Sequence, residues 1–83
     1  MQTITNSPDI EINAVYRNYE AGFDVRAVAN PDYRGGPGDR FVVQMRSDIH
    51  EPWDRPVDRC SDAASACERV AVYLTWTRSP FSR

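Results

Sequence analysis

Residues 23–46 read FDVRAVANPDYRGGPGDRFVVQMR, and the fold prediction starts from this stretch. Alternation of apolar and polar side chains is typical of strands with one buried face. The loop between the two alternating parts, residues 30–39, holds three of the four glycines and two of the six prolines. The sequence therefore predicts strands at residues 23–29 and 40–46. In the first strand Phe23, Val25, Ala27 and Ala29 alternate with Asp24, Arg26 and Val28. In the second, Phe41, Val43 and Met45 alternate with Val42, Gln44 and Arg46.

A third alternating stretch precedes these two. Between residues 10 and 19 the apolar positions are Ile10, Ile12, Ala14 and Tyr16. Glu20, Ala21 and Gly22 follow, and glycine accepts the positive φ that tight turns need. The pattern predicts a strand from Ile10 that forms a hairpin with residues 23–29.

The C-terminal third predicts one helix. Residues 62–78 contain no glycine or proline, and Asp58, Ser61 and Asp62 are candidate N-caps. Pro52 and Pro56 make residues 47–57 an irregular connection. One helical stripe carries Ala63, Ala66, Cys67, Val70, Leu74 and Thr77.

Together these elements predict an α+β domain in the order β-β-β-α. A three-stranded, mainly antiparallel sheet carries one C-terminal helix on one face. We expect a single domain over residues 1–83, with a flexible lead-in (1–9), a core (10–78) and a tail (79–83). So small a domain buries a thin core, which a partner or a second copy often completes.

The composition narrows the function. The chain has 10 arginines, no lysine and 12 acidic residues, for a net charge of −2. Arginine without lysine is typical of a GC-rich genome. Because the net charge is negative and the arginines are dispersed along the chain, we expect no direct binding of duplex DNA. No apolar run approaches the roughly 20 residues of a membrane span, and the N-terminus lacks a signal-peptide pattern. These features predict a soluble protein in the cytoplasm.

Catalysis is not expected. The chain has one histidine, His50, and two cysteines, Cys60 and Cys67, which we interpret as reduced thiols. His50 lies among acids in residues 48–54, but one histidine with nearby acids is a weak signal for a metal or for acid–base chemistry. We interpret this segment as a solvated loop that Trp53 anchors to the body. The sequence predicts no enzyme, no cofactor and no metal.

Two sets of side chains are candidate contacts for a partner. Tyrosine and arginine are enriched at interface hot spots, which singles out Tyr33, Arg34 and Arg40 around the glycine-rich loop. Acidic residues recur every three or four positions from residue 48 to residue 62. Such a row either mimics nucleic acid or serves solubility and helix capping. The acidic candidates for partner binding are Asp48, Glu51, Asp54 and Asp58.

Val72 and Trp76 are candidates for an oligomer interface. They are i, i+4 neighbours on the predicted helix, on the side away from Val70 and Leu74. A second apolar face on a helix indicates a homodimer contact. In the alternative, Phe81 folds back over Trp76 within one chain.

The architecture from Ile10 to Arg78 resembles small phage-encoded anti-CRISPR proteins. The segment Ile12 to Ala29 with the helix start Ser61 to Ala66 is also similar to the N-terminal domain of HicB-type antitoxins. The first resemblance implies a non-enzymatic inhibitor in the host cytoplasm. Its partner would be a Cas subunit of a type I effector complex, with target DNA binding blocked. The second implies an antitoxin-like or regulatory module that neutralises a partner protein or binds nucleic acid.

Overall fold

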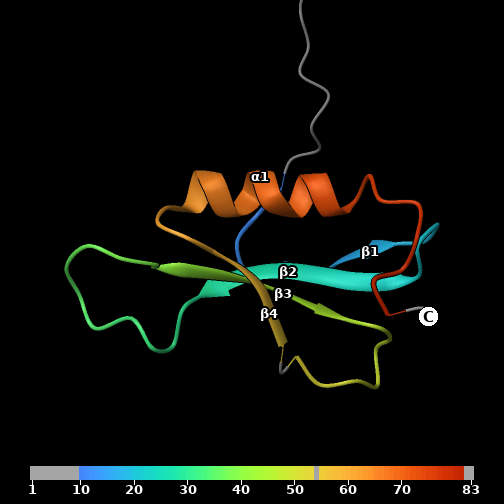
Figure 1. Ribbon diagram of the computed structural model, residues 1–83, viewed down its shortest axis with the longest axis horizontal. Helices are drawn as coiled ribbons and strands as arrows, with labels where there is room; N and C mark the ends of the chain where they lie inside the picture. Colours follow the sequence, from blue (N-terminus) through green and yellow to red (C-terminus); the bar gives the residue numbers. More distant parts are fainter. Residues whose placement is uncertain (1–9, 54, 82–83) are drawn as a thin grey trace, which may run out of the picture.

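The computed structural model describes residues 10–53 and 55–81, so the predicted lead-in at residues 1–9 lies outside the described range. A four-stranded antiparallel sheet in the order β1-β2-β3-β4 carries one helix, α1, across one face (Figure 1). The α+β class is confirmed, whereas the predicted number of three strands is wrong. The elements are β1 (Tyr16–Asn18), β2 (Phe23–Ala29), β3 (Phe41–Arg46), β4 (Arg55–Cys60) and α1 (Ala63–Tyr73).

The centre of the sheet matches the prediction from alternation. β2 has the predicted bounds, β3 begins one residue later than predicted, and their register runs from Asp24 opposite Arg46 to Ala29 opposite Phe41. Side chains at alternate positions point to opposite faces, so the apolar set of both strands meets α1. The core formed in this way contains Phe23, Val25, Ala27, Val43, Met45, Cys60, Ala66 and Val70, all buried.

The first strand is shorter than predicted. Alternation in exposure does extend from Ile10 to Arg17, but only Tyr16–Asn18 pair with β2. Asn13 adopts a φ of 74°, and its N–H donates to the carbonyl of Ala27 at 2.7 Å. This left-handed residue interrupts extended backbone, so the ladder begins only after the turn.

The fourth strand corrects the prediction that residues 47–57 are irregular and that Asp58 is a helix cap. β4 is an edge strand, where a proline without an N–H is tolerated. Its register jumps from Asp58 opposite Val43 to Pro56 opposite Gln44, which skips Val57 as a bulge. The proline and the bulge together removed the alternation that would have revealed the strand.

Helix α1 begins where the sequence predicts and ends earlier. Asp62 is the N-cap, and its carboxylate accepts the N–H of Ser65 at 2.7 Å. The helix stops at Tyr73 rather than at Arg78, because the amide of Asn18 on β1 donates to the carbonyls of Tyr73 and Trp76 and holds the chain in a turn. Within residues 10–53 and 55–81, no helix is long and apolar enough to cross a bilayer.

Candidate functional site

The sheet face turned away from α1, here called the open face, is organised by a buried carboxylate. Asp24 is 4% exposed and lies directly between Arg17 on β1 and Arg46 on β3. Arg17 Nη1 donates to Asp24 Oδ1 at 2.9 Å, and Arg46 Nε donates to Oδ2 at 2.8 Å. Burial alone raises the pKa of Asp24, but the two arginines outweigh it and hold the pKa below its ordinary value of 3.8. Asp24 is therefore ionised at neutral pH, and one carboxylate serves two guanidinium groups.

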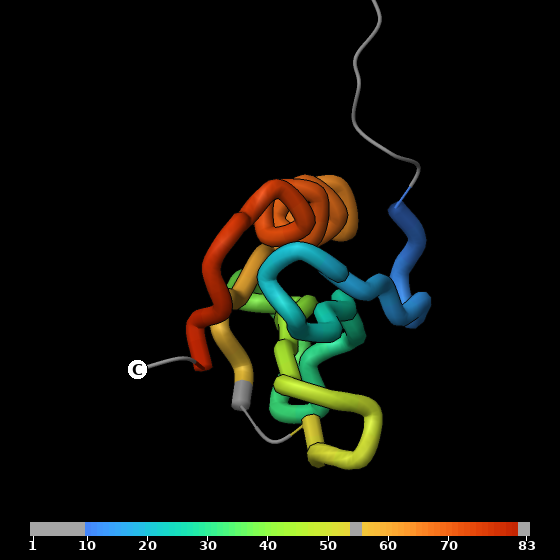
Figure 2. The backbone as a smooth tube through the Cα atoms, turned by 90° about the vertical axis from the view of Figure 1, so that its right-hand side faces the viewer, coloured from blue at the N-terminus to red at the C-terminus, as the bar shows by residue number. Residues whose placement is uncertain are grey.

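Trp53 stacks on this face against two arginines. The guanidinium carbons of Arg26 and Arg46 lie 4.4 Å and 4.2 Å from the centre of its ring. Cations at this distance over an indole are attracted by the ring quadrupole. Figure 2 shows residues 47–53 on the side of the sheet opposite α1. The expectation that Trp53 anchors this segment to the body is confirmed.

Arg26 differs from its neighbour in having no acid beside it. Its Nε donates to Gln44 Oε1 at 2.8 Å, and none of the carboxylates in the described part of the chain forms an ion pair with it. Burial and the charge of Arg46 lower the pKa of Arg26 from its ordinary value. The open face thus holds a half-buried positive charge that forms no ion pair with an acid among residues 10–53 and 55–81.

A shallow hollow of about 440 Å³ adjoins the Asp24 ion pairs. Arg17, Asp24 and Arg46 line its base, and Val15 and Ile49 line its sides. Ile49 is 70% exposed and Val15 is 48% exposed. Exposed apolar side chains beside arginines give this hollow both apolar area and charged donors that a partner can contact.

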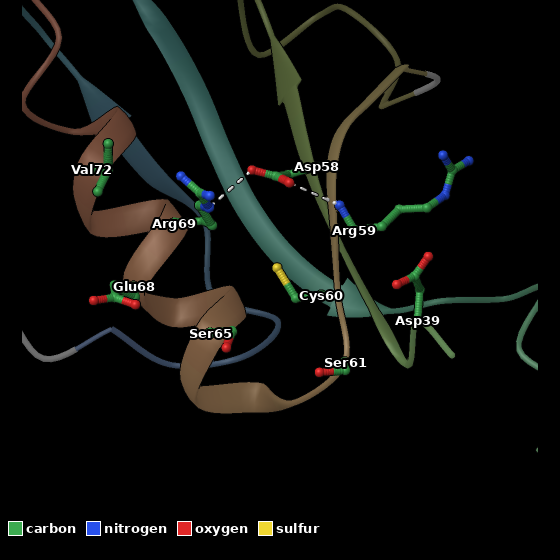
Figure 3. Close-up of a pocket in the computed structure, with 9 residues that line it drawn as sticks. All are labelled: Asp39, Asp58, Arg59, Cys60, Ser61, Ser65, Glu68, Arg69 and Val72. Atoms are coloured by element: carbon green, nitrogen blue, oxygen red, sulfur yellow. Dashed lines mark hydrogen bonds and ion pairs between the residues drawn. The ribbon is translucent and has the colours of Figure 1, made fainter. Parts of the chain in front are cut away.

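A second hollow, a groove of about 560 Å³, lies between α1 and the edge strand β4 (Figure 3). Asp58 points from β4 toward the helix, where Arg69 Nε lies 3.2 Å from its Oδ2. The Tyr73 hydroxyl donates to the same oxygen at 3.2 Å. Burial, and then the nearby Asp58 charge, raise the pKa of the Cys60 thiol at the floor of the groove. Two of the charged residues that line this groove, Asp58 and Arg69, are thus already paired with each other.

The edge of β4 is also protected against the addition of another strand. Pro56 has no N–H to offer, and the N–H of Arg59 donates to the carboxylate of Asp58 at 3.1 Å. The bulge at Val57 further disturbs the edge. Edges blunted in this way resist pairing with a second chain. Of the two hollows, the one on the open face is the better candidate for a binding site.

Comparison of the chain with protein-family models, with curated proteins and with solved structures finds no match. Within the part of the chain that the structure describes, no group of three or more His, Cys, Asp or Glu side chains is arranged to hold a metal ion. The groups that the open face offers for contact are guanidinium groups, an indole ring and exposed aliphatic side chains.

The predicted partner-binding residues fall in three places. Tyr33 and Arg40 belong to the loop between β2 and β3, where the Arg40 guanidinium lies 5.7 Å from the Tyr33 ring and the Tyr33 hydroxyl donates to the carbonyl of Gly36. Arg34 is exposed in the same loop. The acidic candidates do not form one row. Asp48 and Glu51 are exposed before Trp53, Asp54 lies outside the described residues, and Asp58 faces the helix.

Val72 and Trp76 do not share a helix face, because α1 ends at Tyr73. Val72 is 42% exposed on the helix, whereas Trp76 lies in the turn that follows. The Trp76 ring packs edge-on against Tyr73, with centroids 5.0 Å apart, and against Phe23, at 6.2 Å. Trp76 thus closes one end of the core and remains 38% exposed. The interface role of both residues stays a prediction.

Asp24, Arg26 and Arg46 were not predicted from the sequence as members of a site. A signal for them exists in the same alternation that predicts the strands, because positions 24, 26, 44 and 46 are all charged or amide-bearing. Two neighbouring strands with such residues on one face indicate a polar network on that face. The stacking of Trp53 on this network was not readable, since the ring comes from an irregular segment.

Proposed function

We propose that this chain is a small, non-enzymatic binding protein that contacts its partner through the open face. One observation carries the proposal: Trp53 is stacked on Arg26 and Arg46, and Arg46 lines a hollow together with the exposed Ile49. Tryptophan and arginine are enriched at the hot spots of protein interfaces. The open face is also the better of the two candidates, because in the α1–β4 groove Asp58 already pairs with Arg69 and accepts a hydrogen bond from Tyr73.

The partner that we propose is a Cas subunit of a type I CRISPR effector complex, with target DNA binding blocked by the bound chain. What supports this choice is the resemblance of the sequence from Ile10 to Arg78 to small phage-encoded anti-CRISPR proteins. In this setting the predicted contacts Tyr33, Arg34, Arg40, Asp48 and Glu51 would extend the surface around the open face.

Purified type I effector complex tests the choice of partner. Increasing amounts of the chain are added before labelled target DNA, and the fraction of DNA bound is measured by gel shift. The proposal expects DNA binding to fall in proportion to the chain added. Unchanged DNA binding by representative type I complexes would contradict the proposal that a type I effector complex is the partner. Capture of a small ribonuclease from a bacterial lysate, identified by mass spectrometry, would instead support an antitoxin-like module.

A pair of substitutions tests the contact face. Ile49→Asp places a charge at the hollow on the open face, and Val72→Asp makes the matched change on the helix. Both side chains are exposed, so both variants should remain folded. We expect Ile49→Asp to weaken partner binding at least tenfold and Val72→Asp to leave it unchanged. The reverse pattern would move the contact to the helix.

A further inference from the structure

Among the described residues, Arg26 is the arginine of the open face network that forms no ion pair with a carboxylate. Asp24 pairs instead with Arg17 and Arg46, at 2.9 Å and 2.8 Å. The single hydrogen bond of the Arg26 side chain to another described residue is the one from Nε to Gln44. Its two terminal amino groups therefore remain as donors in a fixed fork.

The surroundings of Arg26 favour an incoming anion. Arg46 stacks on the same indole ring, so two guanidinium groups lie close together in a partly desolvated place. The pKa of Arg26 is lowered by burial and by this neighbour, which means that its charge is disfavoured in the free protein. A negative group beside Arg26 would remove that penalty, and hydrogen bonds between ionised partners are the strong ones.

The other side chains of the open face indicate which class of anion would bind next to Arg26. Asp48 and Glu51 are exposed in the segment that leads to Trp53, and they repel a polyphosphate chain. Ile49 and Val15 offer apolar contact next to the arginines. A protein segment with isolated carboxylates between apolar side chains complements this mixture, whereas a nucleic acid does not.

We infer that Arg26 is a specificity-determining residue that receives a carboxylate from an acidic, partly apolar segment of the partner protein, while an apolar side chain of that segment packs over Ile49. This inference rests on the proposed function, since it names the chemistry that the open face recognises. The planar fork of Arg26, held by Gln44 and the Trp53 ring, is already oriented for a bidentate pair.

Two blocked pentapeptides test the inference without a partner in hand. One has the sequence Asp-Leu-Glu-Leu-Asp, and the other is its amide counterpart Asn-Leu-Gln-Leu-Asn. Binding to the isotope-labelled chain is followed by NMR through the side-chain signals of Arg26 and Trp53. We expect the acidic peptide to bind about tenfold more tightly than the amide peptide, because one charge-assisted pair is lost in the latter. A short oligothymidylate serves as the nucleic-acid probe.

Variants assign the effect to one side chain. Arg26→Gln should reduce the ratio between the two peptides to about one, Arg26→Lys should give an intermediate ratio because lysine lacks the fork, and Arg78→Gln, an exposed arginine outside this cluster, should leave the ratio unchanged. Equal binding of both peptides by the wild type, an unchanged ratio in Arg26→Gln, or tighter binding of the oligothymidylate overturns the inference. The first two outcomes overturn the role of Arg26 but do not affect the Ile49→Asp test of the contact face. Failure of this inference can therefore be distinguished from failure of the proposed function.

Discussion

At the residue scale, Asp24 connects three strands through its two ion pairs. Replacing it with asparagine keeps the shape but leaves Arg17 and Arg46 without a counter-charge. Removing one partner of a buried pair is costly, and because Arg17 is partly exposed we expect Asp24→Asn to lower the free energy of unfolding by about 2–3 kcal/mol. Urea denaturation measures the change. Asp48→Asn, an exposed acid, is the control and should stay within about 0.5 kcal/mol.

The pH dependence of stability follows from the same residue. The pKa of Asp24 is lower in the folded chain than its ordinary value of 3.8, so the folded state favours the ionised form. The resulting stabilisation is complete above pH 3.8 and is lost as the pH falls through the lower folded pKa. In acid titrations followed by circular dichroism, the stability difference between wild type and Asp24→Asn should shrink below pH 3.8. A difference that stays constant down to about pH 2 would contradict this role.

At the scale of elements, Asn18 joins the β1–β2 hairpin to the end of α1. Its amide donates to the carbonyls of Tyr73 and Trp76 at 3.0 Å and 2.8 Å, and its carbonyl oxygen accepts the N–H of Ala21 at 2.9 Å. Asn18 is buried, so removal of its side chain leaves these groups unsatisfied away from water.

We expect Asn18→Ala to destabilise the chain by about 2–3 kcal/mol and to speed hydrogen exchange at the end of α1. Thr75→Ala removes an exposed hydroxyl that donates to the carbonyl of Val72 and should cost less than about 1 kcal/mol. Similar losses in both variants would show that the turn, not the buried amide, ends the helix.

At the scale of the whole molecule, the helix surface around Val72 and the neighbouring Trp76 stays a predicted homodimer contact. Trp76 also packs on Phe23, so its truncation would damage the core and confuse the result. Val72→Asp is the cleaner variant, because this side chain is exposed. Light scattering should find a dimer for the wild type and a folded monomer for Val72→Asp. A wild-type monomer at tens of micromolar contradicts the dimer.

The charge of the whole chain predicts weak contact with duplex DNA. The net charge is −2, and Asp24 and Asp58 already neutralise Arg17, Arg46 and Arg69 in part. Affinity for a duplex comes largely from counterion release at a concentrated basic surface, whereas the arginines of this chain are dispersed and its 12 acidic residues outnumber its 10 arginines. Fluorescence anisotropy with a labelled duplex near physiological salt should detect no sub-micromolar, salt-sensitive binding.

The sequence by itself determined the features that depend on residues close to one another along the chain. Alternation placed β2 and β3, because a period of two allows only one set of side chains to face the core. Asp62 was readable as an N-cap, because its carboxylate reaches an N–H only three residues ahead.

The tertiary structure decided what depends on distant residues. The end of α1 is set by Asn18, 55 positions before the carbonyl of Tyr73 that it binds, so no helical pattern could predict it. β4 forms despite Pro56, because it pairs with β3; the sequence of residues 55–60 alone does not predict a strand. The candidate site arises in the same way: only folding brings Trp53 onto Arg26 and Arg46, and only the pairing of Asp24 with Arg17 and Arg46 distinguishes them from Arg26, which forms no ion pair in the described part of the chain.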